Sequence, residues 1–380
     1  MKIAIYVQDM RASGVVRTMI ALAQRLAATD EVVLLAGHAS GLFGAADVVP
    51  ARFVAARAEA QGRLPRLTVV PDLRLALREL NPDVVLSGGN FGHFSIWAAT
   101  LGLRLPVVYV FSNAMERQGQ PWRTRWRRFW SSLLVRGAGG AILVGANLVR
   151  SKVFASHVAS GRAAFVPNGI DLSAVPQPTG AAPEPMRGAE PVVLSIGRLQ
   201  PQKGFESLIA AIATVRRQRP VRLVVLGTGS TSYREALLAH AEALGVREHV
   251  LFAGTTDDVY PWLRAAHVFA LASRWEGSSI ALLEAMAANT PVVASVTAGD
   301  AAQVLEHGRH GVLVDPEDAE AFAAALLRQI DDPVRPGARV RDYDLPLMVR
   351  AYHDVLIQAL ARAKGAREPT RSAAGTRPSR

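Results

Sequence analysis

Short runs of β-branched residues alternate with helical patterns along this chain, and this alternation limits the folds open to it. The runs in the first half cover residues 3–7, 32–36, 84–87, 107–111 and 141–144. Those in the second half cover residues 192–196, 223–226, 250–253, 268–271, 292–295 and 312–314. Such alternation is typical of parallel sheets built from βαβ units. The sequence therefore predicts an α/β protein with two doubly wound, Rossmann-like domains.

A proline-rich stretch separates the two halves. Residues 176–191 hold five prolines and no apolar periodicity, so we expect a linker there. This places one domain in residues 1–175 and a second in residues 192–344. The remaining predicted segments are closing helices over residues 345–363 and a disordered basic tail over residues 364–380. Two such sheets facing each other form a cleft at their strand carboxyl ends, where doubly wound sheets bind ligands.

The composition excludes several classes of protein. The chain has no cysteine, which excludes disulfide frameworks and thiol nucleophiles. The apolar stretch at the N-terminus is too short for a signal peptide, and no apolar segment is long enough to span a bilayer. We therefore expect a cytoplasmic protein. The net charge of +11 is concentrated in residues 117–136 and 361–380, and the remainder balances to zero. A nucleic-acid-binding face is therefore not required.

The basic stretch over residues 121–136 interleaves arginines with Trp122, Trp126, Phe129 and Trp130. This composition suits anionic lipid headgroups and aromatic insertion at a membrane interface. The same spacing also describes an ordinary helix docked on the sheet with a solvated basic edge. Both interpretations stay open, and the first predicts peripheral contact with the inner face of a membrane.

Two cations follow the first strand of the second half. In GRLQPQKG, Gly197 lets the backbone approach a ligand, Arg198 can grip phosphate oxygens and Lys203 adds a point charge. A diphosphate would suit this arrangement. The alternative is a surface loop with two solvated cations.

The segment WEGSSIALLEAMA, residues 275–287, carries two carboxylates around the predicted start of a helix. Glu276 precedes the free backbone N–H groups of residues 277–280, which form an anion site. Glu284 lies inside an otherwise apolar helix, so it faces a cleft or needs a buried partner. Amides for a phosphate and two carboxylates for hydroxyl groups match the parts of a sugar nucleotide. The alternative is helix capping with Glu284 in a structural ion pair.

The motifs SIGRLQPQKGF, LFAGTTDDV, ASRWEGSSIALLEAMAANTPVVAS and HGRHGVLVDPEDAEAFAAAL, preceded by PNGID, occur in this order. With them the chain resembles a family 4 retaining glycosyltransferase of the GT-B fold. The resemblance implies that Arg198 and Lys203 bind the donor diphosphate, that Glu276 contacts the transferred sugar, and that Glu284 holds the ribose. It also implies donor contacts from a set of small or backbone groups: Gly14, Gly197, Gly277, Ser278, Ser279 and Ile280.

The sequence departs from the family pattern at three places. Ser13 occupies the position of a first glycine before Gly14. Ser112 and Asn113 follow the strand after which many members place a histidine; His93 is the nearest substitute, although a histidine at a helix start is as often structural. Around residues 297–303 the family often has paired glycines and a glutamate, whereas this chain has Thr297, Ala298, Gly299, Asp300 and Gln303. We therefore treat His93, Asn113 and Gly299 as secondary candidates.

The resemblance implies an enzyme that transfers a sugar, of hexosyl type, from a nucleotide-sugar to a glycan or lipid-linked acceptor with retention, in cell-envelope or exopolysaccharide biosynthesis. We expect no cofactor. We also expect no essential metal ion, because the adjacent Asp257 and Asp258 fit helix capping better than chelation. One alternative is a sugar-nucleotide epimerase or phosphorylase on the same fold, and a more distant one is a nucleic-acid-binding protein. A dinucleotide oxidoreductase would rest on GTGSTS at residues 227–232, which lacks the third glycine of that motif.

Overall fold

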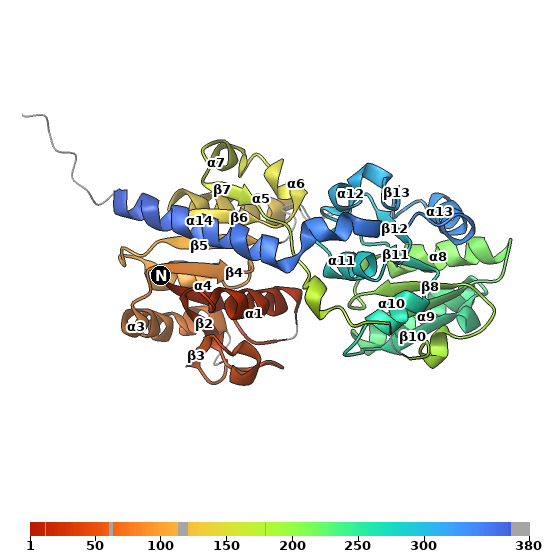
Figure 1. Ribbon diagram of the computed structural model, residues 1–380, viewed down its shortest axis with the longest axis horizontal. Coiled ribbons are helices and arrows are strands. Elements are labelled where there is room, and N and C mark those ends of the chain that lie inside the picture. The colour runs from red at the N-terminus through yellow and green to blue at the C-terminus, as the bar shows by residue number, and fades with distance from the viewer. Residues whose placement is uncertain (12, 61–63, 113–120, 179, 366–380) are drawn as a thin grey trace, which may run out of the picture.

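Each half of the chain forms a parallel sheet, as the alternating pattern predicts (Figure 1). The computed structural model describes residues 1–11, 13–60, 64–112, 121–178 and 180–365. The first sheet has seven strands in the order β3-β2-β1-β4-β5-β6-β7. Their bounds are β1 Lys2–Val7, β2 Glu31–His38, β3 Arg52–Arg57, β4 Val84–Gly88, β5 Val107–Phe111, β6 Gly140–Leu143 and β7 Ala163–Phe165.

The second sheet has six strands in the order β10-β9-β8-β11-β12-β13. Their bounds are β8 Val192–Ile196, β9 Arg222–Leu226, β10 Val250–Gly254, β11 Val268–Leu271, β12 Val292–Ser295 and β13 Val312–Val314. The predicted boundaries of all six strands lie within two residues of those in the structure. In the first sheet β3 and β7 were not predicted, because β3 is a half-buried edge strand with arginine at both ends and β7 has only three residues.

Helices cover both faces of both sheets. In the first domain they are α1 Gly14–Leu26, α2 Pro65–Thr68, α3 Val70–Leu80, α4 His93–Thr100, α5 Pro121–Arg136, α6 Ala146–Val149 and α7 Ala155–Ala159. The second half of the chain contributes α8 Phe205–Arg216, α9 Thr231–Ala243, α10 Tyr260–Ala265, α11 Ile280–Ala287, α12 Ala301–Val304, α13 Ala319–Asp331 and α14 Leu345–Gly365.

Side chains of successive strand residues enter opposite cores. On β1, Ile3 and Ile5 belong to one buried cluster, whereas Ala4 and Tyr6 belong to the cluster on the other face. The same division occurs on β8, where Val193 packs on one face and the residues beside it pack on the other. A strand that is buried on both faces needs apolar residues at every position, which explains the continuous apolar runs of the sequence.

The chain crosses between the domains twice, and the two crossings pair with each other. The backbone N–H of Ile170 donates to the carbonyl of Tyr343 at 2.8 Å, and that of Leu345 donates to the carbonyl of Ile170 at 2.8 Å. Helix α14 then lies across the first domain, where its apolar side completes the core beneath β4 to β6 (Figure 1). The expected closing helices are thus one helix, and it continues to Gly365, two residues into the predicted tail. Residues 366–380 of that tail lie outside the described part of the chain.

The proline-rich stretch packs along the second domain. Met186 lies in the short 3₁₀ turn Glu184–Met186 and is buried in a core cluster of that domain. The guanidinium of Arg222 at the start of β9 donates to the carbonyl of Pro185 at 3.3 Å and to that of Arg187 at 2.5 Å. The stretch is therefore anchored to the second sheet over much of its length. Among the helices of the described residues, none combines the length and the hydropathy that crossing a bilayer requires.

The packing of helix α14 can be tested at Tyr352, because its side chain is fully buried. The Tyr352 hydroxyl has no hydrogen-bond partner within the described residues. We expect Tyr352→Phe to keep or raise the free energy of unfolding, because an unsatisfied buried hydroxyl costs about 1–3 kcal/mol. Tyr352→Ala should lower it by about 3–5 kcal/mol through the cavity it leaves. Urea unfolding of both variants checks this, and a Tyr352→Phe loss as large as that of Tyr352→Ala would contradict it.

Candidate active site

The candidate site forms where two neighbouring strands of the second sheet end. Strands β8 and β11 pair in parallel, although some 70 residues separate them in the sequence. The loop after β8 leads to the 3₁₀ turn Pro201–Lys203, and the loop after β11 carries Glu276. Because parallel strands end at the same edge of a sheet, the two predicted motifs meet there.

Lys203 and Glu276 form an ion pair at this edge. The Lys203 Nζ donates to Oε1 of Glu276, and Ser273 Oγ donates to the same oxygen at 2.9 Å. Both charged side chains are largely buried, with exposed fractions of 17% for Lys203 and 11% for Glu276. A Cβ on Gly197 would lie 3.0 Å from Cε of Lys203, so the absence of a side chain at Gly197 gives the lysine its path across the turn. The sequence predicted both charged groups as ligands of the donor but did not predict their pairing.

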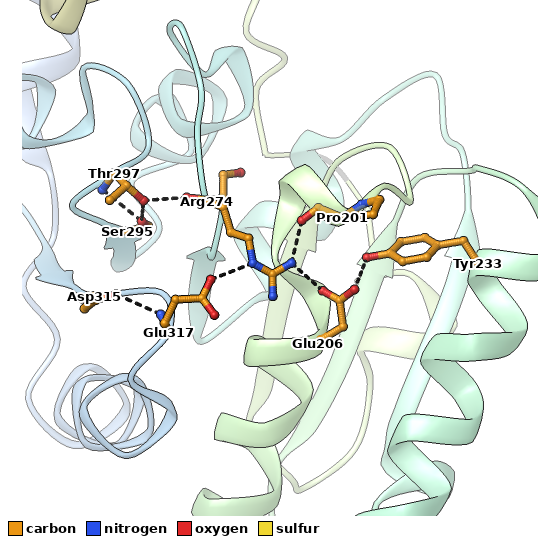
Figure 2. Close-up of polar contacts among 9 residues, drawn as sticks. Pro201, Glu206, Tyr233, Arg274, Ser295, Thr297, Asp315 and Glu317 are labelled. Carbon is orange, nitrogen blue, oxygen red and sulfur yellow. Dashed lines mark hydrogen bonds and ion pairs between the residues drawn. The ribbon is translucent and has the colours of Figure 1, made fainter. Parts of the chain in front are cut away.

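Arg274 fixes the relative position of the two loops (Figure 2). Its Nη1 donates to the carbonyl of Pro201 at 2.8 Å and to Glu206 at 3.1 Å, and its Nε donates to Glu317 at 2.6 Å. The Tyr233 hydroxyl in turn donates to the other oxygen of Glu206 at 2.5 Å. Sequence reasoning gave Arg274 no role, because a cation beside a motif does not reveal its partners. In the structure it is a positioning residue that joins the Lys203 turn to the Glu276 loop.

The start of α11 lies against several close-packed loops. Gly299 has a φ of +63°, and a Cβ there would lie 2.2 Å from the carbonyl oxygen of Gly277, so only glycine fits. From the first domain, the Asn168 side-chain amide donates to the carbonyl of Ser278 at 3.3 Å. Gly145 also approaches Gly277 closely. The predicted segment 277–280 therefore lies at the domain interface, and the secondary candidate Gly299 packs beneath it.

Helix α1 of the first domain faces α11 from across the interface. A Cβ on Gly14 would lie 3.4 Å from Cδ1 of Ile280, and Ser13 caps α1 by accepting the N–H of Val16 at 3.2 Å. Burial raises the pKa of Glu284 on α11, while the charge of Arg17 on α1 lowers it. Gly14 and Arg17 on α1 thus lie opposite Ile280 and Glu284 on α11. Arg198 is exposed at the edge of the same region.

A further carboxylate, Asp300, lies at this interface. It is 2% exposed, and neither of its oxygens forms a well-aligned hydrogen bond within the described residues. Burial raises its pKa to about 7; Ser278 beside it lowers the pKa and the charge of Glu276 raises it. Sequence reasoning noted Asp300 only as part of an atypical stretch. Its burial depends on the close packing of Gly299 on Gly277, which no local pattern reveals.

His93 occupies a structural position in the first domain. Its Nε2 donates to the carbonyl of Val110 at 3.1 Å, and its Nδ1 accepts from Ser87 at 2.8 Å. Burial lowers its pKa to about 3, so the ring stays neutral, and both ring nitrogens are occupied. This geometry favours the structural alternative for His93 over contact with a ligand. Asn113 lies outside the described residues.

The assembled groups define what the site can bind. Two cations and a helix N-terminus can hold a diphosphate, and carboxylates on either side can accept hydroxyl hydrogen bonds. Asp258 accepts the backbone N–H of Tyr260 at 2.9 Å, which is a local turn contact; the cap position of α10 belongs to Val259, so the expected capping by Asp258 is wrong. Within the residues described, His, Asp and Glu side chains form no group of three that could hold a metal ion.

Two family models match the chain. The model described as Glycosyltransferase Family 4 matches residues 12–174, and the model described as Glycosyl transferases group 1 matches residues 190–332. A GDP-mannose-dependent alpha-(1-6)-phosphatidylinositol monomannoside mannosyltransferase of Mycobacterium tuberculosis is 34% identical over 196 residues, which are 47% of this chain and 50% of the relative. The lipopolysaccharide core biosynthesis glycosyltransferase LpsE of Rhizobium meliloti is 40% identical over 142 residues, 37% of this chain and 40% of the relative. The matched region thus spans half or less of these curated relatives.

Solved structures share the fold over nearly the whole chain. Anabaena HepE in complex with UDP-glucose superposes with a TM-score of 0.75 at 19% identity, covering 94% of this chain and 99% of HepE. A sucrose-phosphate synthase from Thermosynechococcus elongatus gives a TM-score of 0.75 at 18% identity, covering 95% and 99%. At these identities the likeness shows the two-domain fold.

The pKa of Asp300 predicts how stability depends on pH. The folded-state value of about 7 exceeds the ordinary value of 3.8, so between these values the folded protein keeps a proton that the unfolded chain loses. The contribution of Asp300 to stability therefore falls as pH rises from about 4 to about 7, by at most about 1.4 kcal/mol per pH unit. We expect Asp300→Asn to raise the melting temperature relative to wild type by an amount that grows between pH 4 and pH 7 and levels off above pH 7. Asp332→Asn, at an exposed position, is the matched control; a gain in Asp300→Asn that is the same at every pH would contradict the assignment.

Proposed function

The chain belongs to the glycosyltransferases of family 4 with the GT-B fold, and from this premise we propose that it transfers a sugar from a nucleotide-sugar donor to a glycan or lipid-linked acceptor. Glycans and lipid-linked sugars are the acceptors used in the assembly of the cell envelope and of extracellular polysaccharides, so we assign the reaction to that assembly. The observation that carries the proposal is the Lys203–Glu276 pair at the start of α11, with Glu284 inside the same helix and α1 of the other domain opposite.

The donor diphosphate takes the place of Glu276 as the partner of Lys203. The charge of Lys203 is balanced by the Glu276 carboxylate, so Lys203 is held at the site without an unpaired buried charge. A diphosphate offers more negative charge than one carboxylate and can also reach the exposed guanidinium of Arg198. After Lys203 has moved to the diphosphate, Glu276 remains held by Ser273 and can accept hydrogen bonds from the hydroxyl groups of the transferred sugar.

Glu284 suits the ribose of the donor. Its side chain is half-buried and forms no hydrogen bond with the described residues, and its raised pKa reflects the burial of its carboxylate. Ribose hydroxyls would donate to this carboxylate and supply the hydrogen bonds that burial removes. The amides of residues 277–280 would then contact the phosphate and the sugar between the two glutamates.

The same groups supply the catalysis. Cleavage of the anomeric bond develops negative charge on the leaving diphosphate, and Lys203, Arg198 and the N-terminus of α11 place positive charge where it develops. We propose that these groups act without a metal ion. The anomeric configuration is retained in this proposal, with the leaving phosphate accepting the proton of the acceptor hydroxyl on the same face of the sugar.

Peripheral contact with the inner face of a membrane is part of the proposal. Trp126 and Phe129 of α5 are more than 60% exposed, and Trp122 is exposed on the same side of the helix. An exposed aromatic stripe on a basic helix suits insertion at the lipid interface. This orientation would bring a lipid-linked acceptor to the first domain.

A thermal-shift screen against UDP, GDP, ADP and their sugar conjugates tests the donor site. We expect one nucleotide series to stabilise the protein by about 2.7 kcal/mol at a hundredfold excess over its Kd. Lys203→Ala and Glu284→Ala should reduce this by about 1.4 kcal/mol for each tenfold loss of affinity. The exposed residues Arg247 and Glu248 provide the charge-matched controls Arg247→Ala and Glu248→Ala, which should keep the full shift.

A flat response of the wild-type protein to every nucleotide would contradict the donor site. An epimerase or phosphorylase would share the nucleotide shift, so it is separated by products. The proposed transferase makes a glycoside only when an acceptor hydroxyl is supplied, whereas an epimerase converts the donor alone and a phosphorylase requires inorganic phosphate.

A further inference from the structure

Both sheets reverse their strand order at one point. In the second sheet β8 pairs with β9 on one side and with β11 on the other, and the Lys203–Glu276 pair lies beyond the carboxyl ends of β8 and β11. The first sheet has the same arrangement at β1, which pairs with β2 and with β4. Doubly wound sheets bind ligands outside the carboxyl ends of their strands at such a switch point. A ligand of the first domain is therefore expected at the loops that follow β1 and β4.

An aromatic ring and two cations lie at this switch point. Phe91 follows β4, Arg11 follows β1, and Arg66 belongs to α2. The guanidinium carbon of Arg66 lies 3.4 Å from the centroid of the Phe91 ring, and that of Arg11 lies 5.8 Å from the same centroid. A guanidinium that lies on a ring keeps its N–H groups free at the edge of its plane, where they can hold a carboxylate or a phosphate. These three residues form the Arg66 cluster.

The charge of the Arg66 cluster is only partly balanced. Asp9 pairs with Arg11 at 2.7 Å, whereas no carboxylate of the described residues pairs with Arg66. Partial burial lowers the pKa of Arg66, and the charge of Arg11 lowers it further, so the two cations repel each other. An anion bound beside Arg66 would offset this repulsion.

A buried polar network holds the Arg66 cluster in place. The Ser95 hydroxyl oxygen on α4 lies 2.9 Å from the backbone carbonyl oxygen of Arg66 and 2.8 Å from Oε1 of Gln8, so it joins α2 to the end of β1. The Tyr6 hydroxyl donates to the same oxygen of Gln8 at 2.9 Å. All three side chains of this network are buried. Buried networks whose members are satisfied are rigid, and this one fixes the backbone of Arg66 beside Phe91.

We propose that the Arg66 cluster binds the anionic group of an acidic acceptor sugar, either a phosphate or a carboxylate. The half-exposed ring of Phe91 supplies apolar surface beside the cations, which suits a sugar that carries the anion better than a free inorganic ion. The inference rests on the proposed transfer reaction and adds the charge that its acceptor carries. Each substrate then lies at the switch point of one sheet, the donor at β8 and β11 and the acceptor anion at β1 and β4.

Ligand-observed NMR titration of the full-length protein at constant ionic strength tests the assignment. The probes are glucose 6-phosphate, glucuronic acid and glucose. We expect at least one acidic sugar to bind about tenfold or more tightly than glucose, and the acid that binds more tightly identifies the anionic group. Arg66→Ala should weaken binding of that acid by about tenfold to a hundredfold, because a charged hydrogen-bond donor is lost. Phe91→Leu should weaken it by about twofold to fivefold through loss of the cation–π contact.

Two variants serve as controls. Arg52→Ala removes an exposed cation of the same domain at the start of β3, on the opposite edge of the sheet, and should bind the acidic sugar as wild type does. Lys203→Ala removes a cation of the donor site and should also keep this binding. The melting temperature of each unliganded variant shows whether it is folded.

Three outcomes would overturn the inference. If glucose binds as tightly as the acids, the Arg66 cluster does not recognise an anion. If Lys203→Ala abolishes binding and Arg66→Ala keeps it, the acids bind at the donor site. If neither acid binds, the acceptor assignment is wrong, while the nucleotide screen still decides the transfer reaction. Binding that depends on Arg66, together with a flat nucleotide screen, would support the anion site and contradict the proposed transfer.

Discussion

The candidate site depends on one interaction, the ion pair between Lys203 and Glu276. Each residue belongs to a loop after a different strand, and the pair joins the two loops. A buried lysine or a buried glutamate alone would carry an uncompensated charge, which costs several kcal/mol. Arg274 reinforces the same junction through Pro201, Glu206 and Glu317, so the geometry of the pair is fixed by neighbours as well as by its own attraction.

The second constraint is the way the two domains are joined. Ile170 pairs with the backbone at residues 343–345, so both crossings of the chain lie at one place. Asn168 contacts Ser278 close to this junction, and α14 returns to complete the first core. The start of α11 is therefore packed against the first domain, and Gly14 and Arg17 of α1 lie near Ile280 and Glu284 although they belong to the other domain.

Sequence reasoning predicted the fold because it depends on local patterns, whereas the roles given to the candidate site residues stay predictions. Strands buried on both faces give continuous apolar runs, and only the edge strand β3 and the three-residue β7 lack that signal. The carboxylates and cations of the motifs could be proposed as site residues because each of their loops follows a recognisable strand. The pairing of Lys203 with Glu276 and the contacts of Arg274 could not be predicted, since they depend on which strands become neighbours. The same limit applies to His93, which the carbonyl of Val110 on the adjacent strand ties into the core.

The central claim is that the donor diphosphate displaces Glu276 from Lys203, and nucleoside diphosphate affinity in a double-mutant cycle tests it most directly. Calorimetric titrations would compare wild type, Glu276→Gln, Lys203→Ala and the double variant. We expect Glu276→Gln to bind the diphosphate more tightly than wild type, because Lys203 no longer has to leave a carboxylate, and we expect this gain to disappear in the Lys203→Ala background. Weaker binding by Glu276→Gln, or an equal gain in both backgrounds, would contradict it.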